Sequence, residues 1–176
     1  MERLDLIKCR KSNVVYSRAT AAKALNNLLD KIKEVNKKED FIYRITKAVL
    51  FGSYINSIKE KVGDLDVAIY IVLKDDTIPE IEQNQNRARI KSYGLPTPME
   101  MIYGKEEIFR FIKDRKKVLE LHDGVMVDYA SQKRKEPKSY IYFDDYKIIY
   151  EEGCQWLVMY VGLQFAKEVL DNGRWY

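Results

Sequence analysis

The sequence predicts an α/β fold of the α+β kind, with a mixed sheet of about four to five strands flanked by helices. Apolar segments typical of strands alternate along the chain with segments that have the spacing of amphipathic helices. The chain has 176 residues, which is enough for one domain with a proper core, or for one domain with a helical appendage. It contains no internal repeat and no low-complexity linker.

The first half of the chain reads as a helix, two strands and a second helix. Residues 18–37 carry Ala, Leu, Ile and Val at helical spacing and predict an amphipathic helix. Residues 42–51 contain a short buried strand that ends at residue 51, and residues 64–73 form the next strand. Residues 79–92 are rich in Glu, Gln, Asn and Arg and predict an exposed helix, which a stretch rich in Gly and Pro ends.

The second half reads as strand, helix, strand and helix. Residues 98–103 form a short strand-like run. Residues 106–121 carry apolar side chains at helical spacing and predict a helix that stops at His122-Asp123-Gly124. Residues 125–129 predict another strand, and one helix of roughly residues 145–171 follows.

These elements predict two parts. Residues 1–140 are expected to form the core domain with its N-terminal helix, and residues 141–176 a C-terminal helical extension packed on that core. The apolar face of the final helix is expected to pack internally or to contact a second copy or a partner protein. Its apolar stretch at 154–163 is too short to span a bilayer, so no membrane association is predicted.

Charge and cysteine content limit the kinds of protein that this chain can be. The formal net charge of +4 suits a protein that handles phosphates, but it is too small to indicate duplex DNA binding. Cys9 and Cys154 have neither the spacing of metal ligands nor that of a disulfide framework. The first residues are charged and do not resemble a signal peptide. These features predict a reduced, cytoplasmic setting.

The most informative motif is Asp64-Leu65-Asp66, at the start of the second predicted strand. Residues two apart on a strand point to the same face, so Asp64 and Asp66 direct two carboxylates to one place. Such like charges repel, and a divalent cation is the usual reason for holding them together. Upstream, Gly52-Ser53 ends a buried strand in a turn small enough for phosphate oxygens to approach its backbone N–H groups.

Leu50-Phe51-Gly52-Ser53-Tyr54 followed by Asp64-Leu65-Asp66-Val67 resembles the Gly-Ser…Asp-x-Asp pattern of the DNA polymerase β-like nucleotidyltransferase superfamily. The chain is most similar to its small members: minimal nucleotidyltransferases, antibiotic nucleotidyltransferases and MNT-type antitoxins that adenylylate partner proteins. The likeness covers about residues 45–75 and continues more weakly to about residue 130. Gly63 departs from the family, which often has Ser there. The apolar run follows the acidic pair, whereas dehalogenase-type phosphatases and many glycosyltransferases place the pair where a strand ends.

The resemblance implies a third acidic residue on a neighbouring strand, which completes the metal site and takes the proton from the attacking hydroxyl. Glu100 is the favoured candidate because it is centred in an apolar strand-like run, where a carboxylate is costly to bury unless it is paired or metal-bound. Asp128 has the same local character and stays open as the alternative. His122 is expected to cap a helix end and is left out of the predicted site.

The resemblance therefore implies a metal-dependent nucleotidyltransferase. It would move an NMP group from an NTP to an acceptor hydroxyl on a small molecule or a protein, with release of pyrophosphate. A nucleic-acid acceptor is compatible with the core but not favoured. Asp64, Asp66 and Glu100 are expected to bind two Mg²⁺ or Mn²⁺ ions, and Gly52, Ser53 and Lys61 to bind the NTP phosphates. The alternative is a catalytically silent nucleotide- or partner-binding module, of the antitoxin or regulatory kind.

Overall fold

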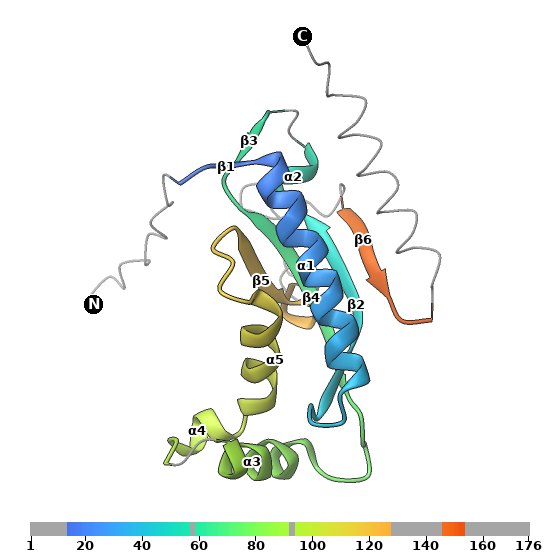
Figure 1. Ribbon diagram of the computed structural model, residues 1–176. Coiled ribbons are helices and arrows are strands. Elements are labelled where there is room, and N and C mark those ends of the chain that lie inside the picture. The colour runs from blue at the N-terminus through green and yellow to red at the C-terminus, as the bar shows by residue number, and fades with distance from the viewer. Residues whose placement is uncertain (1–13, 57–58, 92–93, 128–145, 154–176) are drawn as a thin grey trace, which may run out of the picture.

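Four strands form the central sheet of the computed structural model, in the order β5-β4-β2-β6 (Figure 1). The structure describes residues 14–56, 59–91, 94–127 and 146–153. Strand β4 is antiparallel to β2 and parallel to β5, and β6 is antiparallel to β2, so the sheet is mixed as predicted. A second, two-stranded sheet pairs β1 with β3 in antiparallel orientation. The strands are β1 (Tyr16–Ser17), β2 (Tyr43–Phe51), β3 (Lys61–Val62), β4 (Leu65–Leu73), β5 (Leu119–Asp123) and β6 (Tyr146–Glu151).

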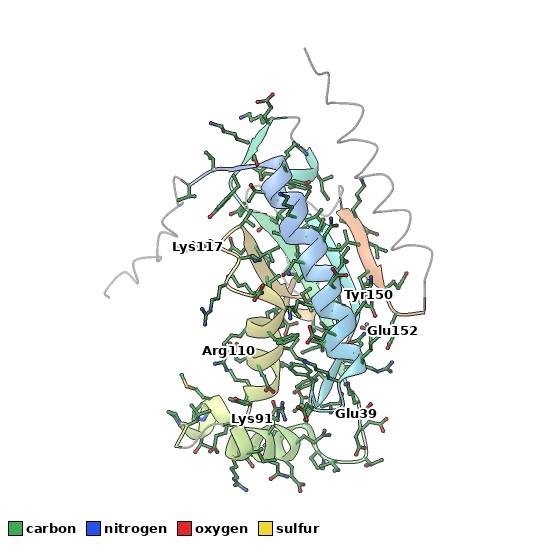
Figure 2. All side chains as sticks on the ribbon, in the orientation of Figure 1. Glu39, Lys91, Arg110, Lys117, Tyr150 and Glu152 are labelled. Atoms are coloured by element: carbon green, nitrogen blue, oxygen red, sulfur yellow. The ribbon has the colours of Figure 1, made fainter. Side chains whose placement is uncertain are left out.

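The long helix α1 (Arg18–Lys37) confirms the helix predicted at these residues. It begins at Ser17, whose Oγ accepts a hydrogen bond of 3.1 Å from the backbone N–H of Thr20. Seven of its apolar side chains are buried along one stripe. Near its end, Asn36 donates to the carbonyl of Ile45 and to the hydroxyl of Tyr150, both at 2.8 Å. Asn36 thus attaches the helix to both β2 and β6, and Tyr150 is labelled in Figure 2.

Within the described residues, the two faces of the sheet are covered differently. On one face, α1 and α5 (Tyr103–Lys113) pack against alternating residues of the strands, among them Leu65, Val67 and Ile69, and form the main core. On the other face, a smaller cluster unites Val49, Phe51, Ala68 and Val127, with Tyr70 and Ile148 packed beside it. Because side chains alternate along a strand, every second residue of β4 belongs to this less covered face.

Three shorter helices are α2 (Ser53–Asn56), α3 (Glu80–Lys91) and α4 (Thr97–Glu100). Helix α3 confirms the helix predicted at 79–92, and buried polar contacts fix it to its neighbours. Asn84 donates to the hydroxyl of Tyr43 at 2.6 Å and accepts from the backbone N–H of Gly104 at 2.8 Å. Arg87 forms two hydrogen bonds of 2.8 Å with Glu107 of α5.

The strand predicted at 98–103 is wrong, because this segment contains the end of α4 and the start of α5. Pro98 lies in the first turn of α4, where a missing N–H and a fixed φ are compatible with a helix. The apolar side chains of Met99, Met101 and Ile102 are exposed rather than buried in a sheet. The apolar run of this segment therefore indicated a strand that does not form.

The helix predicted at 106–121 is correct only as far as Lys113. Asp114 and Arg115 adopt positive φ values of 46° and 58°, so the chain leaves the helix and turns into β5. These backbone angles favour glycine, and the absence of Gly or Pro at this point hid the boundary from the sequence. Residues 124–127 are helical, which corrects the strand predicted at 125–129 over its described part.

Residues 146–151 also differ from expectation. They form β6, which pairs with β2 in the central sheet, whereas the sequence predicted a helix of roughly residues 145–171. The rest of that predicted helix, from residue 154, lies outside the described residues, and so does most of the extension predicted at 141–176. Among the described residues, no helix combines the length and the apolar character needed to cross a membrane.

Candidate metal centre

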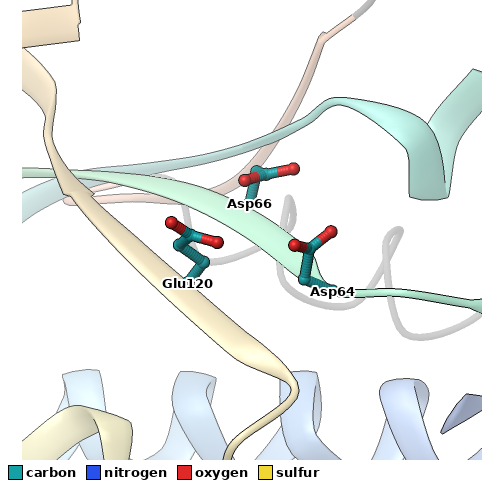
Figure 3. A group of neighbouring side chains, drawn as sticks. All are labelled: Asp64, Asp66 and Glu120. Carbon is teal, nitrogen blue, oxygen red and sulfur yellow. The ribbon is translucent and has the colours of Figure 1, made fainter. Parts of the chain in front are cut away.

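Three carboxylates gather where β4 and β5 begin. Asp64, Asp66 and Glu120 each offer an oxygen atom, and these atoms all lie within 4.8 Å of one another. Asp66 and Glu120 are paired in the parallel register of the two strands, and Asp64 directly precedes β4. Figure 3 shows the three side chains projecting from the strands on the side away from helix α1. The group is therefore on the face opposite α1, which fewer of the described side chains cover.

The alternation of the strands fixes this placement. Leu65 and Val67 are fully buried in the core on the α1 side, so the residues between and before them must face the other way. In β5, Leu119 is buried in the same core, with 1% of its surface exposed. The next residue, Glu120, therefore points to the same side as Asp66, its partner in β4. The backbone N–H of Leu65 donates to the carbonyl of Val118 at 2.7 Å, which holds the two strand starts together.

The Gly-Ser turn lies directly against this group. Phe51, the last residue of β2, is paired with Asp66, and Gly52 follows with a φ of +80°. A Cβ atom at Gly52 would stand 2.6 Å from Oδ2 of Asp66, so only glycine allows the turn and the carboxylate to approach this closely. Ser53 is exposed and begins the short helix α2. The structure thus brings Gly52 directly against Asp66, and Ser53 is the next residue of the same turn.

His122 also belongs to the centre, although the sequence assigned it to a helix end. It is in strand β5, and its Nε2 lies 3.2 Å from Oδ1 of Asp66. Its ring packs on Phe51 with the ring centroids 5.4 Å apart. The prediction failed because the helix expected at 106–121 ran through the segment that is a strand. In a strand, Glu120 and His122 share a face.

The electrostatics of the group show the cost of holding three acids together. Burial, followed by the charges of Asp66 and Glu120, raises the pKa of Asp64 above its ordinary value of 3.8. Oxygen atoms of Glu120 and Asp64 lie within 4.8 Å of each other, a spacing that a shared proton or a cation between two carboxyl groups stabilises. His122 acts in the opposite sense and lowers the pKa of Asp64. Carboxylate oxygens are the ligands that Mg²⁺ and Mn²⁺ prefer, so the residues fit a hard divalent cation.

Of the other residues predicted for the site, Glu100 is outside the carboxylate group, Lys61 is three residues before Asp64 in the chain, and Asp128 is not described. Glu100, the favoured third acid, ends α4 and is not part of the carboxylate group, in which Glu120 holds the third position. Asp128, the alternative, lies outside the described residues. Lys61 is exposed on β3, where its backbone pairs with that of Ser17. The one signal for Glu120 in the sequence was the alternation of apolar and polar residues from Leu119 to His122.

Comparison of the chain with protein-family models, with curated proteins and with solved structures gives no match.

Proposed function

We propose that this protein is a metal-dependent nucleotidyltransferase that moves an NMP group from an NTP to an acceptor hydroxyl. The observation that carries the proposal is the meeting of Asp64, Asp66 and Glu120 beside the Gly52-Ser53 turn. The acidic pair and the Gly-Ser turn come from adjacent antiparallel strands, and Glu120 comes from the parallel strand on the other side of β4. The proposed cation site and the proposed phosphate site would therefore meet where Gly52 abuts Asp66.

The three carboxylates would hold Mg²⁺ or Mn²⁺. A bound divalent cation supplies Lewis-acid stabilisation of the negative charge that develops on phosphate oxygens. Asp66 lies between the other two parts of the site, since Glu120 is its partner on β5 and Gly52 approaches it from the end of β2. This position suits Asp66 for holding a cation that also contacts the triphosphate.

The Gly52-Ser53 turn is the proposed phosphate cradle. Its glycine keeps the backbone free of a side chain at the point nearest Asp66, and its serine presents an exposed hydroxyl at the start of α2. Backbone N–H groups and a hydroxyl are suitable donors to the β- and γ-phosphates. In the reaction, the acceptor oxygen forms a bond to the α-phosphorus, the bond between the α-phosphorus and its bridging oxygen breaks, and pyrophosphate leaves.

Glu120 is the proposed general base. It is the exposed member of the group, on the strand at the β5 end of the described sheet, whereas Asp64 and Asp66 are partly buried. A carboxylate there is accessible to an incoming hydroxyl and accepts its proton as the new phosphoester forms. The acceptor is proposed to be a small molecule or a protein hydroxyl, as the resemblance implies.

The test is pyrophosphate release from each of the four NTPs with Mg²⁺ or Mn²⁺, with pools of small hydroxylated antibiotics, tRNA and cell lysate as acceptors. The Asp64→Asn/Asp66→Asn double variant should lose release entirely. Glu120→Gln should lose at least about 100-fold, the typical contribution of a general base. Glu100→Gln is the matched control and should keep wild-type activity, since Glu100 ends α4 outside the carboxylate group.

The outcomes separate the enzyme from its rival. Release that needs the acidic pair and one class of acceptor would support the transferase and identify its substrate. Equal loss in Glu100→Gln and Glu120→Gln would contradict the role given to Glu120. Metal-dependent nucleotide binding without release from any acceptor would instead favour a silent binding module.

A further inference from the structure

His122 lies on strand β5 two residues beyond Glu120, so both side chains are on the face that carries the carboxylate group. Its backbone is paired with that of Ala68, two residues beyond Asp66. The side chain is 30% exposed, and two contacts determine where its ring lies. One contact is the packing on Phe51 and the other is the approach of Nε2 to Asp66.

The carboxylate of Asp66 is in turn held from two sides. Its Oδ1 is 3.2 Å from Nε2 of His122. Its Oδ2 lies so close to Gly52 that a Cβ there would be at 2.6 Å. With one oxygen against an imidazole and the other against a glycine turn, Asp66 has a defined orientation without any cation. Oxygen atoms of Asp64 and Glu120 lie within 4.8 Å of it, and His122 provides a hydrogen-bonding contact on Oδ1 beside these like charges.

We infer that His122 is a positioning residue that orients Asp66 for cation binding by donating its Nε2–H to Oδ1. The inference rests on the proposed metal centre and adds to it a residue that does not itself bind the ion. Phe51 fixes the plane of the imidazole, and the imidazole fixes the carboxylate. Hydrogen-bond partners of metal ligands generally change metal affinity or activity by about 10–100-fold when they are removed.

The first test is Mn²⁺ binding to the full chain without nucleotide, measured by electron paramagnetic resonance of the free ion. His122→Leu removes the donor but keeps an apolar side chain against Phe51, and its Kd for Mn²⁺ should rise by about 10–100-fold. His122→Gln places an amide N–H near the position of Nε2 and should recover most of the affinity. A purely structural role predicts a lower Tm in both variants, with the Kd of the folded protein unchanged.

The second test uses the fact that His122 is the single histidine of the chain, so any imidazole signal belongs to it. Nitrogen NMR of the metal-free wild type should show the tautomer protonated at Nε2. Electron spin-echo spectra of the Mn²⁺-loaded protein should lack the strong coupling of a directly bound nitrogen. A directly bound imidazole nitrogen, or the tautomer protonated at Nδ1, would refute the positioning role, and this test needs no variant to fold.

The binding experiment also separates this inference from the proposed function. If the wild type binds Mn²⁺ and His122→Leu binds it within threefold of the same affinity, the positioning role is refuted while the metal centre stands. If the wild type binds no Mn²⁺, the metal centre and the inference are both refuted, and the wild-type titration alone reveals it.

Discussion

Replacing Asp64 with Asn should stabilise the metal-free protein and remove its response to metal. The oxygens of the three carboxylates lie within 4.8 Å of one another, and Asp64 takes part in two of the three pairs. Two unit charges at this distance repel by about 3.5 kcal/mol at an effective dielectric of about 20, and by about 0.9 kcal/mol in bulk water. Because Glu120 is exposed and Asp66 is 23% exposed, solvent screening places the repulsion near the lower value.

The two pairs together then give about 1–2 kcal/mol in favour of Asp64→Asn. For a domain of this size, that corresponds to a rise in Tm of about 2–8 °C. The assay is thermal unfolding followed by circular dichroism, in chelator and in excess Mn²⁺. Metal at 100 times its Kd should stabilise the wild type by about 2.7 kcal/mol. The order of stability should therefore reverse, with Asp64→Asn more stable in chelator and the wild type more stable in Mn²⁺.

Two results would refute this reasoning. A lower Tm for Asp64→Asn in chelator would mean that the carboxylate makes a net favourable contact in the metal-free protein. An equal rise in Tm with Mn²⁺ in both proteins would mean that the ion binds elsewhere. Glu100→Gln is the control for a general charge effect, since it removes one negative charge outside the carboxylate group and should leave the response to Mn²⁺ unchanged.

The same centre and the core give three more predictions. In chelator, the wild type should lose stability relative to Asp64→Asn as the pH rises from 3.8 through the raised pKa of Asp64, because the folded state binds the proton of Asp64 more tightly than the unfolded state does. Urea unfolding of both proteins at a series of pH values would measure this loss. A difference in unfolding free energy between the two proteins that stays constant with pH would contradict it. Gly52→Ala should lower the free energy of unfolding by about 1–3 kcal/mol and weaken Mn²⁺ binding, because Ala is strained at a φ of +80° and its Cβ would meet Asp66. Gly63→Ala, with no atom within 4 Å of its Cβ, is the matched control and should bind Mn²⁺ normally. Arg87→Met should lower the free energy of unfolding by about 2–3 kcal/mol, because it leaves the partly buried Glu107 unpaired. A second change, Glu107→Leu, should restore most of this loss. Equal urea midpoints in the single and double variants would contradict the prediction.

The local patterns of the sequence were sufficient for half of the fold and for part of the site. The helix at 18–37 and the strands β2 and β4 follow from the spacing of apolar residues, which depends only on neighbours in the chain. The common direction of Asp64 and Asp66 follows from the same two-residue period. The Gly-Ser turn was expected beside this pair, and the structure places Gly52 against Asp66.

The errors lie where local patterns compete. The apolar run around Glu100 resembles a strand, but the chain buries little of it and forms two helical segments instead. The segment from Leu119 to Asp123 is a strand because it pairs with β4 in parallel orientation. No Gly or Pro next to Asp114 indicates the turn that precedes this strand. Residues 146–151 are a strand because β2 has an edge that accepts them. The strand that pairs with each of these segments is distant in the chain, so the local sequence pattern does not indicate the pairing.

The sequence by itself determined the acidic pair and the face to which it points, since both depend on the geometry of a single strand. Only the tertiary structure decided the third acid and the contact of His122 with Asp66, because both arise from the register between β4 and β5. A shift of one residue in that register would turn Glu120 and His122 to the opposite face of the sheet. The burial of Leu119 against the core opposes such a shift, and this packing completes the site.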